Sequence, residues 1–158
     1  MSRIVSSLAA AWVLAANAPA AAGEVPVDIT SCWGGNLRVL APAKGQVFLT
    51  YDVTGLFRSN TPGGAFDATS FECVGSVEYL NGVPSEVGHC VSVDRDGDKT
   101  WGRSLRSKTE DNWVFIGGTG KYAGITGTLK RDRRVQGRPA RAGTTQGCGR
   151  SSGTYRVP

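Results

Sequence analysis

Histidine, charged residues and long apolar runs are all scarce in this chain. One of its 158 residues is His, and Asp, Glu, Lys and Arg together make up only 20% of them. This low charge, combined with 40% hydrophobic residues, argues against a disordered chain. No apolar run reaches the roughly 18 residues that a membrane-spanning helix needs, so we expect no transmembrane anchor.

Zinc-site spacing and helical periodicity are also missing. None of the four cysteines belongs to a C-x-x-C pair, and one His cannot complete a Cys/His cluster, so we expect no metal site. After residue 22, glycines separate short β-branched and aromatic runs, and apolar residues hardly ever recur at helical spacing. This pattern predicts an all-β fold without internal repeats or interdomain linkers.

The first 22 residues have the features of a secretory signal peptide. Arg3 precedes the apolar stretch Ile4–Ala16, small residues follow, and cleavage after Ala20 or Ala22 would satisfy the small-x-small rule. The alternative is a buried N-terminal helix. We therefore expect a periplasmic or secreted protein with a single β-barrel or β-sandwich domain over residues 23–158.

Turn signals divide the remaining chain into about eight candidate strands, a number that suits a closed antiparallel barrel or a sandwich. The candidates are residues 36–41, 46–54, 70–80, 86–93, 99–107, 112–117, 124–131 and 153–157. The glycine-rich and basic stretch 137–153 has no recognisable pattern.

The dipeptide Asn81-Gly82 is typical of the two-residue type I′ turn of a β-hairpin. In that register, Cys73 lies directly opposite Cys90. A bulge near Pro84 is the alternative, and it would swap the two faces of one strand.

An exported protein with four cysteines is expected to form two disulfides. The hairpin register favours a Cys73–Cys90 disulfide, because the turn assignment does not depend on the cysteines. By elimination, Cys32 would join Cys148 and tie the first strand to the last, as in a barrel that closes its sheet. A linkage between Cys32 and Cys73 would contradict this register.

A second dipeptide, Asp96-Gly97, is typical of the same turn type and would pair Cys90 with Arg103 and Ser92 with Trp101. The two turns define a three-stranded meander, with Gly75 and Gly88 leaving room for rings. One face would hold Phe71, Cys73, Val77, Tyr79, Cys90, Trp101 and Leu105; the other would hold Glu72, Ser76, Glu78, His89, Thr100, Ser104 and Arg106.

The most distinctive stretch runs from Gly117 to Gly127 and contains Gly-Gly-Thr-Gly-Lys-Tyr. It imitates nucleotide-binding loops, but the residues after it alternate like a strand, so no helix N-terminus would receive a phosphate. Phe115 and Tyr122 also replace the first glycine and the metal-binding hydroxyl of a phosphate-binding loop. We therefore expect no cofactor, and a tight turn with Tyr122 packing back on the barrel.

Gly117–Tyr122, followed by Gly124 and Gly127, resembles the glycine-rich strand and turn of the allene oxide cyclase and dirigent barrels. The order of elements is also similar to that of small exported bacterial proteins of the same barrel type, with Cys32, Cys90 before Asp94–Asp98, and a final Gly153-Thr154-Tyr155 strand. The resemblance implies an eight-stranded antiparallel barrel with an apolar lumen, whose members bind or guide small hydrophobic molecules. The plant families' catalytic positions have no residue-by-residue match here, so their activity is not carried over.

Catalytic groupings are sparse. The lone histidine, His89, is predicted on the outer face; a bulge that turned it inward would let it act as a general acid or base. Glu72, Glu78 and Glu86 crowd the first hairpin, and their alternation favours a solvated sheet face over paired catalytic carboxylates. These observations favour a protein that is not an enzyme.

Carboxylates alternate along Asp94–Asp98, as they do in calcium loops. The full twelve-residue pattern is absent, because Gly97 comes too early and Leu105 occupies the closing position. We expect a solvated Asp-Gly turn, with a weakly bound surface ion as the alternative.

The two halves of the chain differ in charge. Residues 24–98 hold 4 basic and 10 acidic side chains, whereas residues 99–158 hold 13 basic and 3 acidic ones. Such a basic region either binds an anionic surface or polymer, or balances the acidic half across a homo-oligomer. Export and the lack of interleaved aromatics argue against nucleic acid as a partner. The densest basic cluster comprises Lys130, Arg131, Arg133, Arg134, Arg138 and Arg141.

Three functions remain, ranked by how little each assumes. The first is a barrel that binds a small apolar ligand in its interior. The second is an envelope or extracellular interaction protein that binds an anionic partner through its basic C-terminal third. The third is a cofactor-free isomerase or cyclase. The aromatic residues predicted to line the interior are Tyr51, Phe71, Tyr79, Trp101, Trp113 and Phe115.

Overall fold

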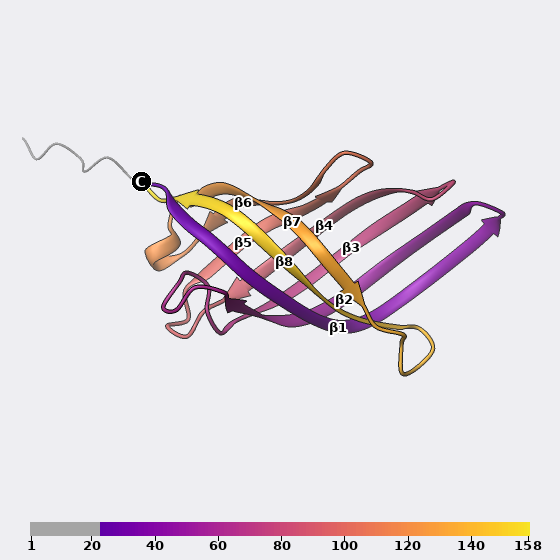
Figure 1. Ribbon diagram of the computed structural model, residues 1–158, viewed down its shortest axis with the longest axis horizontal. Helices are drawn as coiled ribbons and strands as arrows, with labels where there is room; N and C mark the ends of the chain where they lie inside the picture. The colour runs from indigo at the N-terminus through magenta and orange to yellow at the C-terminus, as the bar shows by residue number, and fades with distance from the viewer. Residues whose placement is uncertain (1–22) are drawn as a thin grey trace, which may run out of the picture.

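Eight antiparallel strands close into one barrel in the computed structural model, which describes residues 23–158. The strands are β1 (Val25–Ala43), β2 (Gln46–Ser59), β3 (Thr69–Leu80), β4 (Val83–Val93), β5 (Lys99–Arg106), β6 (Asp111–Gly118), β7 (Thr126–Gln136) and β8 (Thr144–Arg156). Each strand pairs with its neighbours along the chain, and β1 also pairs with β8 (Figure 1). The predicted all-β barrel is therefore confirmed.

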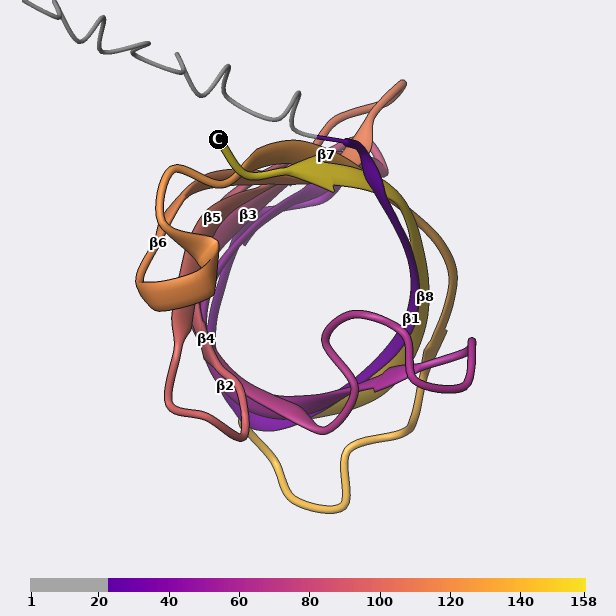
Figure 2. The ribbon, with the colours of Figure 1, turned by 90° about the vertical axis from the view of Figure 1, so that its left-hand side faces the viewer.

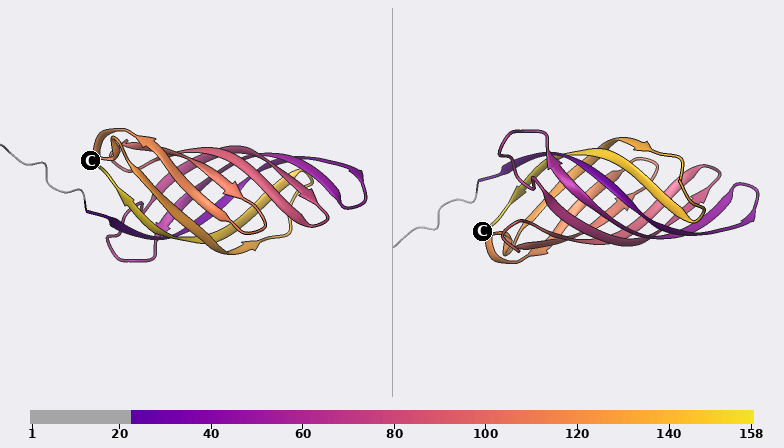
Figure 3. Two further views of the ribbon diagram at one scale, coloured as in Figure 1. Left: turned by 90° about the horizontal axis from the view of Figure 1, so that it is seen from above. Right: turned by 90° about the horizontal axis from the view of Figure 1, so that it is seen from below.

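The strands wind obliquely around an open ring, which is clear when the barrel is viewed along its length (Figure 2). One end carries the start of β1, the end of β8, the β2–β3 loop and the 3₁₀ turn η1 (Gly120–Tyr122). The opposite end carries the hairpins that join β1 to β2, β3 to β4, β5 to β6 and β7 to β8 (Figure 3). The two ends of the barrel thus carry different connecting segments.

Side chains alternate between lumen and solvent along each strand, as the two-residue period of a strand requires. In β4, Glu86 and Cys90 are buried. The valines at 87 and 91 and His89, which alternate with them, are exposed on the outer face. The register of a strand therefore decides which of its side chains face the lumen and which face solvent.

The register predicted for the first hairpin is confirmed. Leu80 pairs with Val83 across Asn81-Gly82, and both turn residues have positive φ values, 52° and 81°, as a type I′ turn requires. Cys73 pairs with Cys90, and their disulfide lies on the lumen side with the two Cα atoms 4.0 Å apart.

The register predicted for the second hairpin is wrong by one residue. Val93 pairs with Lys99, so residues 94–98 form a wider connection than a two-residue turn. The carboxylate of Asp94 accepts hydrogen bonds from the backbone N–H groups of Asp96 (2.9 Å) and Asp98 (3.0 Å), which stabilises this wider loop.

The shifted register exchanges the two faces of β5. Cys90 pairs with Gly102 instead of Arg103, and Ser92 pairs with Thr100 instead of Trp101. The β5 residues predicted on the outside, Thr100, Ser104 and Arg106, therefore face the lumen, whereas Trp101 and Leu105 face outward.

The second predicted disulfide is also present. Cys32 pairs directly with Cys148, and the bond joins β1 to β8 at the seam of the barrel. Cys32 is exposed while its neighbours Ser31 and Trp33 line the lumen, so this disulfide lies on the outer face. Two disulfides fit an oxidising compartment outside the cytoplasm.

Most strands are longer than the sequence indicated, and β1 and β8 differ most. β1 begins at Val25, and β8 occupies much of the stretch that had no recognisable pattern. In β8 the lumen positions are small or polar, because Trp33 of β1 lies against this strand: a Cβ on Gly147 would lie 2.9 Å from Trp33 Cζ2. The hydrophobic alternation that reveals other strands is therefore absent there.

The predicted signal peptide, residues 1–22, lies outside the described residues. Within residues 23–158, no helix is long and apolar enough to cross a membrane.

Candidate functional site in the barrel lumen

The lumen holds a cavity of about 180 Å³, and every strand contributes to its wall. This volume exceeds the roughly 150 Å³ of an engineered cavity that binds benzene, and it is below the roughly 300 Å³ at which drug-sized pockets begin. A ligand of about one ring with a short substituent fits a space of this size.

Stacked aromatic rings fill the end of the lumen where β1 begins and β8 ends. Phe66, from the β2–β3 loop, stacks on Phe115 and Tyr122 with ring centroids 5.5 and 5.4 Å apart. Tyr155 of β8 packs against Phe66 at 5.4 Å. This aromatic end presents an apolar, π-rich surface to the cavity.

The β2–β3 loop reaches over this mouth of the barrel (Figure 2) and has an unusual backbone. Phe66 and Ala68 have φ values of 62° and 54°, a left-handed region that side chains other than glycine rarely adopt. Asp67, between them, accepts hydrogen bonds from Arg58 Nε and from the Ser59 backbone N–H, both at 3.1 Å. These contacts hold the loop in the geometry that inserts Phe66.

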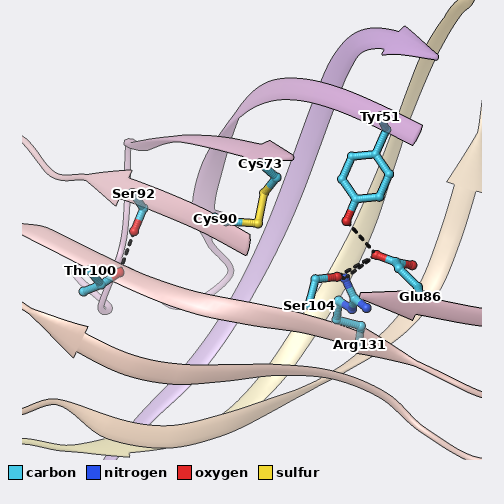
Figure 4. The surroundings of a disulfide bond; sticks show 8 residues. All are labelled: Tyr51, Cys73, Glu86, Cys90, Ser92, Thr100, Ser104 and Arg131. Atoms are coloured by element: carbon cyan, nitrogen blue, oxygen red, sulfur yellow. Dashed lines mark hydrogen bonds and ion pairs between the residues drawn. A yellow bond between two sulfur atoms is a disulfide. The ribbon is translucent and has the colours of Figure 1, made fainter. Parts of the chain in front are cut away.

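Charged and hydroxyl side chains line the opposite part of the lumen. Glu86 of β4 is only 6% exposed, and it accepts hydrogen bonds from Ser104 Oγ at 2.6 Å and Tyr51 Oη at 3.1 Å (Figure 4). Arg131 of β7 donates to Ser104 Oγ at 2.5 Å, and its Nη1 lies 3.7 Å from Glu86 Oε1. Four strands therefore meet at one buried carboxylate.

A glycine pair positions the Tyr51 hydroxyl. Gly75 of β3 pairs with Gly88 of β4. A Cβ on Gly88 would lie 2.0 Å from Tyr51 Oη, so the phenol can lie against the inner side of the wall only because both positions lack side chains. The predicted room for rings at these glycines is confirmed.

Asp111, at the start of β6, extends the charged wall. Its carboxylate lies 2.5 Å from Arg131 Nε, 3.3 Å from Arg134 Nε and 3.8 Å from Arg106 Nε. Arg134 Nη1 also lies 3.7 Å from Glu86 Oε2. We call these five residues the ion cluster; it combines three guanidinium groups with two carboxylates.

The surroundings of Glu86 and Tyr51 shift the pKa values of these two side chains in opposite directions. Burial alone would raise the pKa of Glu86, but the charges of Arg131 and Arg134 and the hydrogen bonds from Ser104 and Tyr51 outweigh it and hold that pKa below its usual value. Burial, followed by the neighbouring Glu86 charge, raises the pKa of Tyr51. At neutral pH the carboxylate is therefore anionic and the phenol neutral.

Five of the six aromatic residues predicted to line the interior border the cavity. These are Tyr51, Phe71, Tyr79, Trp113 and Phe115. Trp101 does not: the shifted β5 register places it on the outer face, 36% exposed, where its indole packs over Gly117.

The predicted basic cluster is divided between the two sides of the wall. Arg131 and Arg134 turn inward and join the ion cluster. A bulge between Asp132 and Val135, with Arg133 at a φ of 46°, breaks the alternation of β7, so two arginines three positions apart share the lumen face. Lys130, Arg133, Arg138 and Arg141 do not border the cavity and are exposed, whereas Arg134 borders the cavity and is also exposed to solvent.

The carboxylates of the Asp94–Asp98 loop pair with a lysine of the same chain, Lys121. Lys121 Nζ lies 2.5 Å from Asp94 Oδ2, contacts Asp96 Oδ2 and lies 3.8 Å from Asp98 Oδ2. The hydrogen bonds that Lys121 donates to Asp94 and Asp96 raise the pKa of Lys121. Among residues 23–158, no group of three or more His, Cys, Asp or Glu side chains is arranged to hold a metal ion.

Sequence reasoning missed most of the ion cluster. Glu86 was grouped with Glu72 and Glu78 as a solvated face, yet it points inward. A two-residue turn at Asp96-Gly97 predicts Ser104 and Arg106 on the outside, whereas the wider β4–β5 loop turns them inward. The Asx-type hydrogen bonding that Asp94 allows was the signal for the wider loop.

Comparison with known proteins adds no relative to this picture. No protein-family model matches the chain, and no curated protein matches it. The fold and the lumen define its class: an eight-stranded antiparallel barrel, stabilised by two disulfides, with one aromatic and one charged end to its interior.

Proposed function

We propose that this protein is an exported, single-domain barrel that binds a small ligand in its lumen. The ligand's apolar part would lie against the aromatic end, and its polar group would face the ion cluster. The observation that carries the proposal is a cavity of about 180 Å³ whose wall combines buried rings with a preformed set of charged donors and acceptors.

The glycine-rich stretch supports the same function. Its resemblance to allene oxide cyclase and dirigent barrels suggests kinship with proteins that bind or guide small hydrophobic molecules. In this chain, Gly120–Tyr122 forms η1 between β6 and β7, and Tyr122 contributes a ring to the aromatic end. The signal-peptide pattern of residues 1–22 and the two disulfides support export to the periplasm or the exterior.

Binding is favoured over general acid or base catalysis by the state of Glu86. An efficient general base has a pKa near the working pH, whereas the pKa of Glu86 is lowered by its arginine neighbours. Its oxygens also accept hydrogen bonds from Tyr51 and Ser104. This carboxylate is suited to orienting neighbours and not to abstracting a proton.

Filling the cavity tests the proposal. Val77 of β3 lines the lumen, whereas Val74 of the same strand is 52% exposed on the outer face. We expect benzyl alcohol to raise the unfolding temperature of the wild type and of Val74→Phe, because a ligand that binds only the folded state stabilises it. It should not raise that of Val77→Phe. An equal response of both variants would contradict a lumen site, and so would a wild type that does not respond.

A second candidate is the binding of an anionic surface through the exposed residues Lys130, Arg133, Arg138 and Arg141. It is weaker than first predicted, because two of the six cluster members turn inward. Binding to anionic vesicles at low salt that disappears at about 1 M salt would support it. Binding that persists unchanged at high salt would contradict an electrostatic role.

A further inference from the structure

The ion cluster carries an excess positive charge that faces the cavity. Its three guanidinium groups, Arg106, Arg131 and Arg134, all border the cavity, and its two carboxylates are Glu86 and Asp111. An uncompensated charge in a partly buried site is costly unless a partner of opposite sign is present.

A fourth arginine that borders the cavity is already matched. Arg150 donates two hydrogen bonds to the carboxylate of Asp28, at 2.8 and 2.5 Å. This pairing lowers the pKa of Asp28 to about 2, chiefly through the hydrogen bond from Arg150. The charge excess therefore belongs to the ion cluster.

Arg106 is the member of the cluster with the weakest contacts. Its Nε lies 3.8 Å from Asp111 Oδ2, and its Nη1 lies 3.5 Å from Tyr79 Oη. Arg131 and Arg134, in contrast, approach Asp111 to 2.5 and 3.3 Å. Within the ion cluster, Arg106 is thus the arginine that uses least of its hydrogen-bonding capacity.

Tyr79 adds a second donor at the same place. Its hydroxyl oxygen accepts the hydrogen bond from Arg106, which leaves the hydroxyl proton available. Both side chains border the cavity, and Arg106 is 29% exposed, so water and solutes reach it. A guanidinium fork beside a phenol is a suitable set of donors for a carboxylate.

We propose that Arg106 and Tyr79 form a subsite for the carboxylate of a small aromatic acid, with the ring in the apolar part of the cavity. This inference rests on the lumen-binding function proposed above. A monoanion balances the single excess charge of the cluster, and a cavity of about 180 Å³ accommodates about one ring. The aromatic end supplies the surface against which that ring packs.

Two probes of nearly the same shape test the subsite: benzoate, which is anionic at pH 7, and benzamide, which is neutral. By calorimetry, we expect the wild type to bind benzoate at least about tenfold more tightly, because hydrogen bonds to charged groups are the stronger ones. Arg106→Met should remove this preference by weakening benzoate binding far more than benzamide binding. Arg103→Met is the matched control: Arg103 belongs to the same strand, pairs with His89 on the outer face, and should change neither affinity.

The outcomes separate this inference from the proposed function. If neither probe binds the wild type, lumen binding itself is contradicted, and the subsite with it. If both bind equally, lumen binding stands and the carboxylate subsite is overturned. An equal loss of affinity for both probes in Arg106→Met would also overturn it, because the arginine would then maintain the shape of the cavity and would not distinguish an anionic ligand from a neutral one.

A conservative variant covers the case in which Arg106→Met fails to fold. Arg106→Lys keeps the charge but lacks the planar fork, so we expect it to retain part of the preference for benzoate. Tyr79→Phe should reduce the preference by removing one donor. A preference that both variants leave at the wild-type value would contradict the assignment of the subsite to these two side chains.

Discussion

The two ends of the lumen are built on different physical terms. At the aromatic end, Phe66, Phe115 and Tyr122 are buried against one another, and their burial contributes directly to folding. At the other end, Glu86 and Arg131 are taken out of water, and their attraction must offset the cost of removing their hydration. The first end stabilises the barrel, whereas the second adds little net stability and would supply directional contacts to the proposed ligand.

This difference explains why the disulfides and the ring stack accompany a charged interior. A chain of this size holds a modest core, and a buried ion cluster reduces its net gain from burial. The Cys73–Cys90 bond joins β3 to β4 on the lumen side, and the Cys32–Cys148 bond joins β1 to β8, where the barrel closes. These links and the aromatic end allow the charged end to be shaped for binding. Substitutions at the aromatic end should therefore reduce stability more than binding, and those at the charged end should reduce binding more than stability.

The largest effect on stability is expected at the aromatic end. Phe115→Ala removes a buried ring from the stack and should lower the free energy of unfolding by about 3–5 kcal/mol in urea titrations. At the charged end, Tyr79→Phe removes one hydroxyl that borders the cavity and should cost less than about 1 kcal/mol. Similar losses in the two variants would remove the energetic distinction between the ends.

A smaller loss is expected from Glu86→Gln. The neutral amide leaves Arg131 without one of its two carboxylates, while Asp111 remains 2.5 Å from its Nε, so we expect a loss of about 2–3 kcal/mol. The double variant Glu86→Leu with Arg131→Met removes both charges and should lose less than the sum of its two single variants. A double-mutant cycle that gives strict additivity would show that the two groups do not interact.

A still smaller difference between the two ends is expected in how steeply stability falls with acid. The folded-state pKa of Glu86 lies below its ordinary value of 4.5, so its contribution to stability is complete above that pH and is lost as the pH falls below it. Phe115→Ala keeps this carboxylate, and its unfolding midpoint should fall with acid in parallel with that of the wild type. Glu86→Gln should fall less steeply, since only the carboxylates common to all three proteins, such as Asp28 and Asp94, still titrate. Parallel curves for all three proteins would contradict a paired Glu86.

The sequence predicted the framework of the barrel well, because its signals are local. Turn dipeptides, alternation and cysteine spacing led to the eight strands and both disulfides, and the Asn81-Gly82 hairpin has the predicted register. The first half of β8 was poorly predicted because its lumen positions include Gly147 and Gly149, which lie against Trp33, a residue more than a hundred positions away. Local patterns do not contain that contact.

The charged end was not predictable, because it depends on two local irregularities. The wide Asp94–Asp98 loop turns Ser104 and Arg106 inward, and the β7 bulge brings Arg131 and Arg134 to one face. Each irregularity changes the face of every residue that follows it in the strand. In a barrel, a one-residue change of register can thus bring charged side chains into the lumen, and the composition of the strand does not reveal it.

The smallest expected effect concerns the backbone that closes the aromatic end. Ala68 has a φ of 54°, where a left-handed conformation costs an alanine about 1–2 kcal/mol, whereas glycine adopts it freely. Ala68→Gly relieves this strain but adds freedom to the unfolded chain, so the expected net result is a stabilisation of about 0.5 kcal/mol. Ala123, with a φ of −57°, is the matched control, and Ala123→Gly should destabilise by a similar amount because only the unfolded-state term applies there. If both glycine variants lose stability equally in urea titrations, the β2–β3 loop stores no strain, and Phe66 closes the lumen without backbone cost.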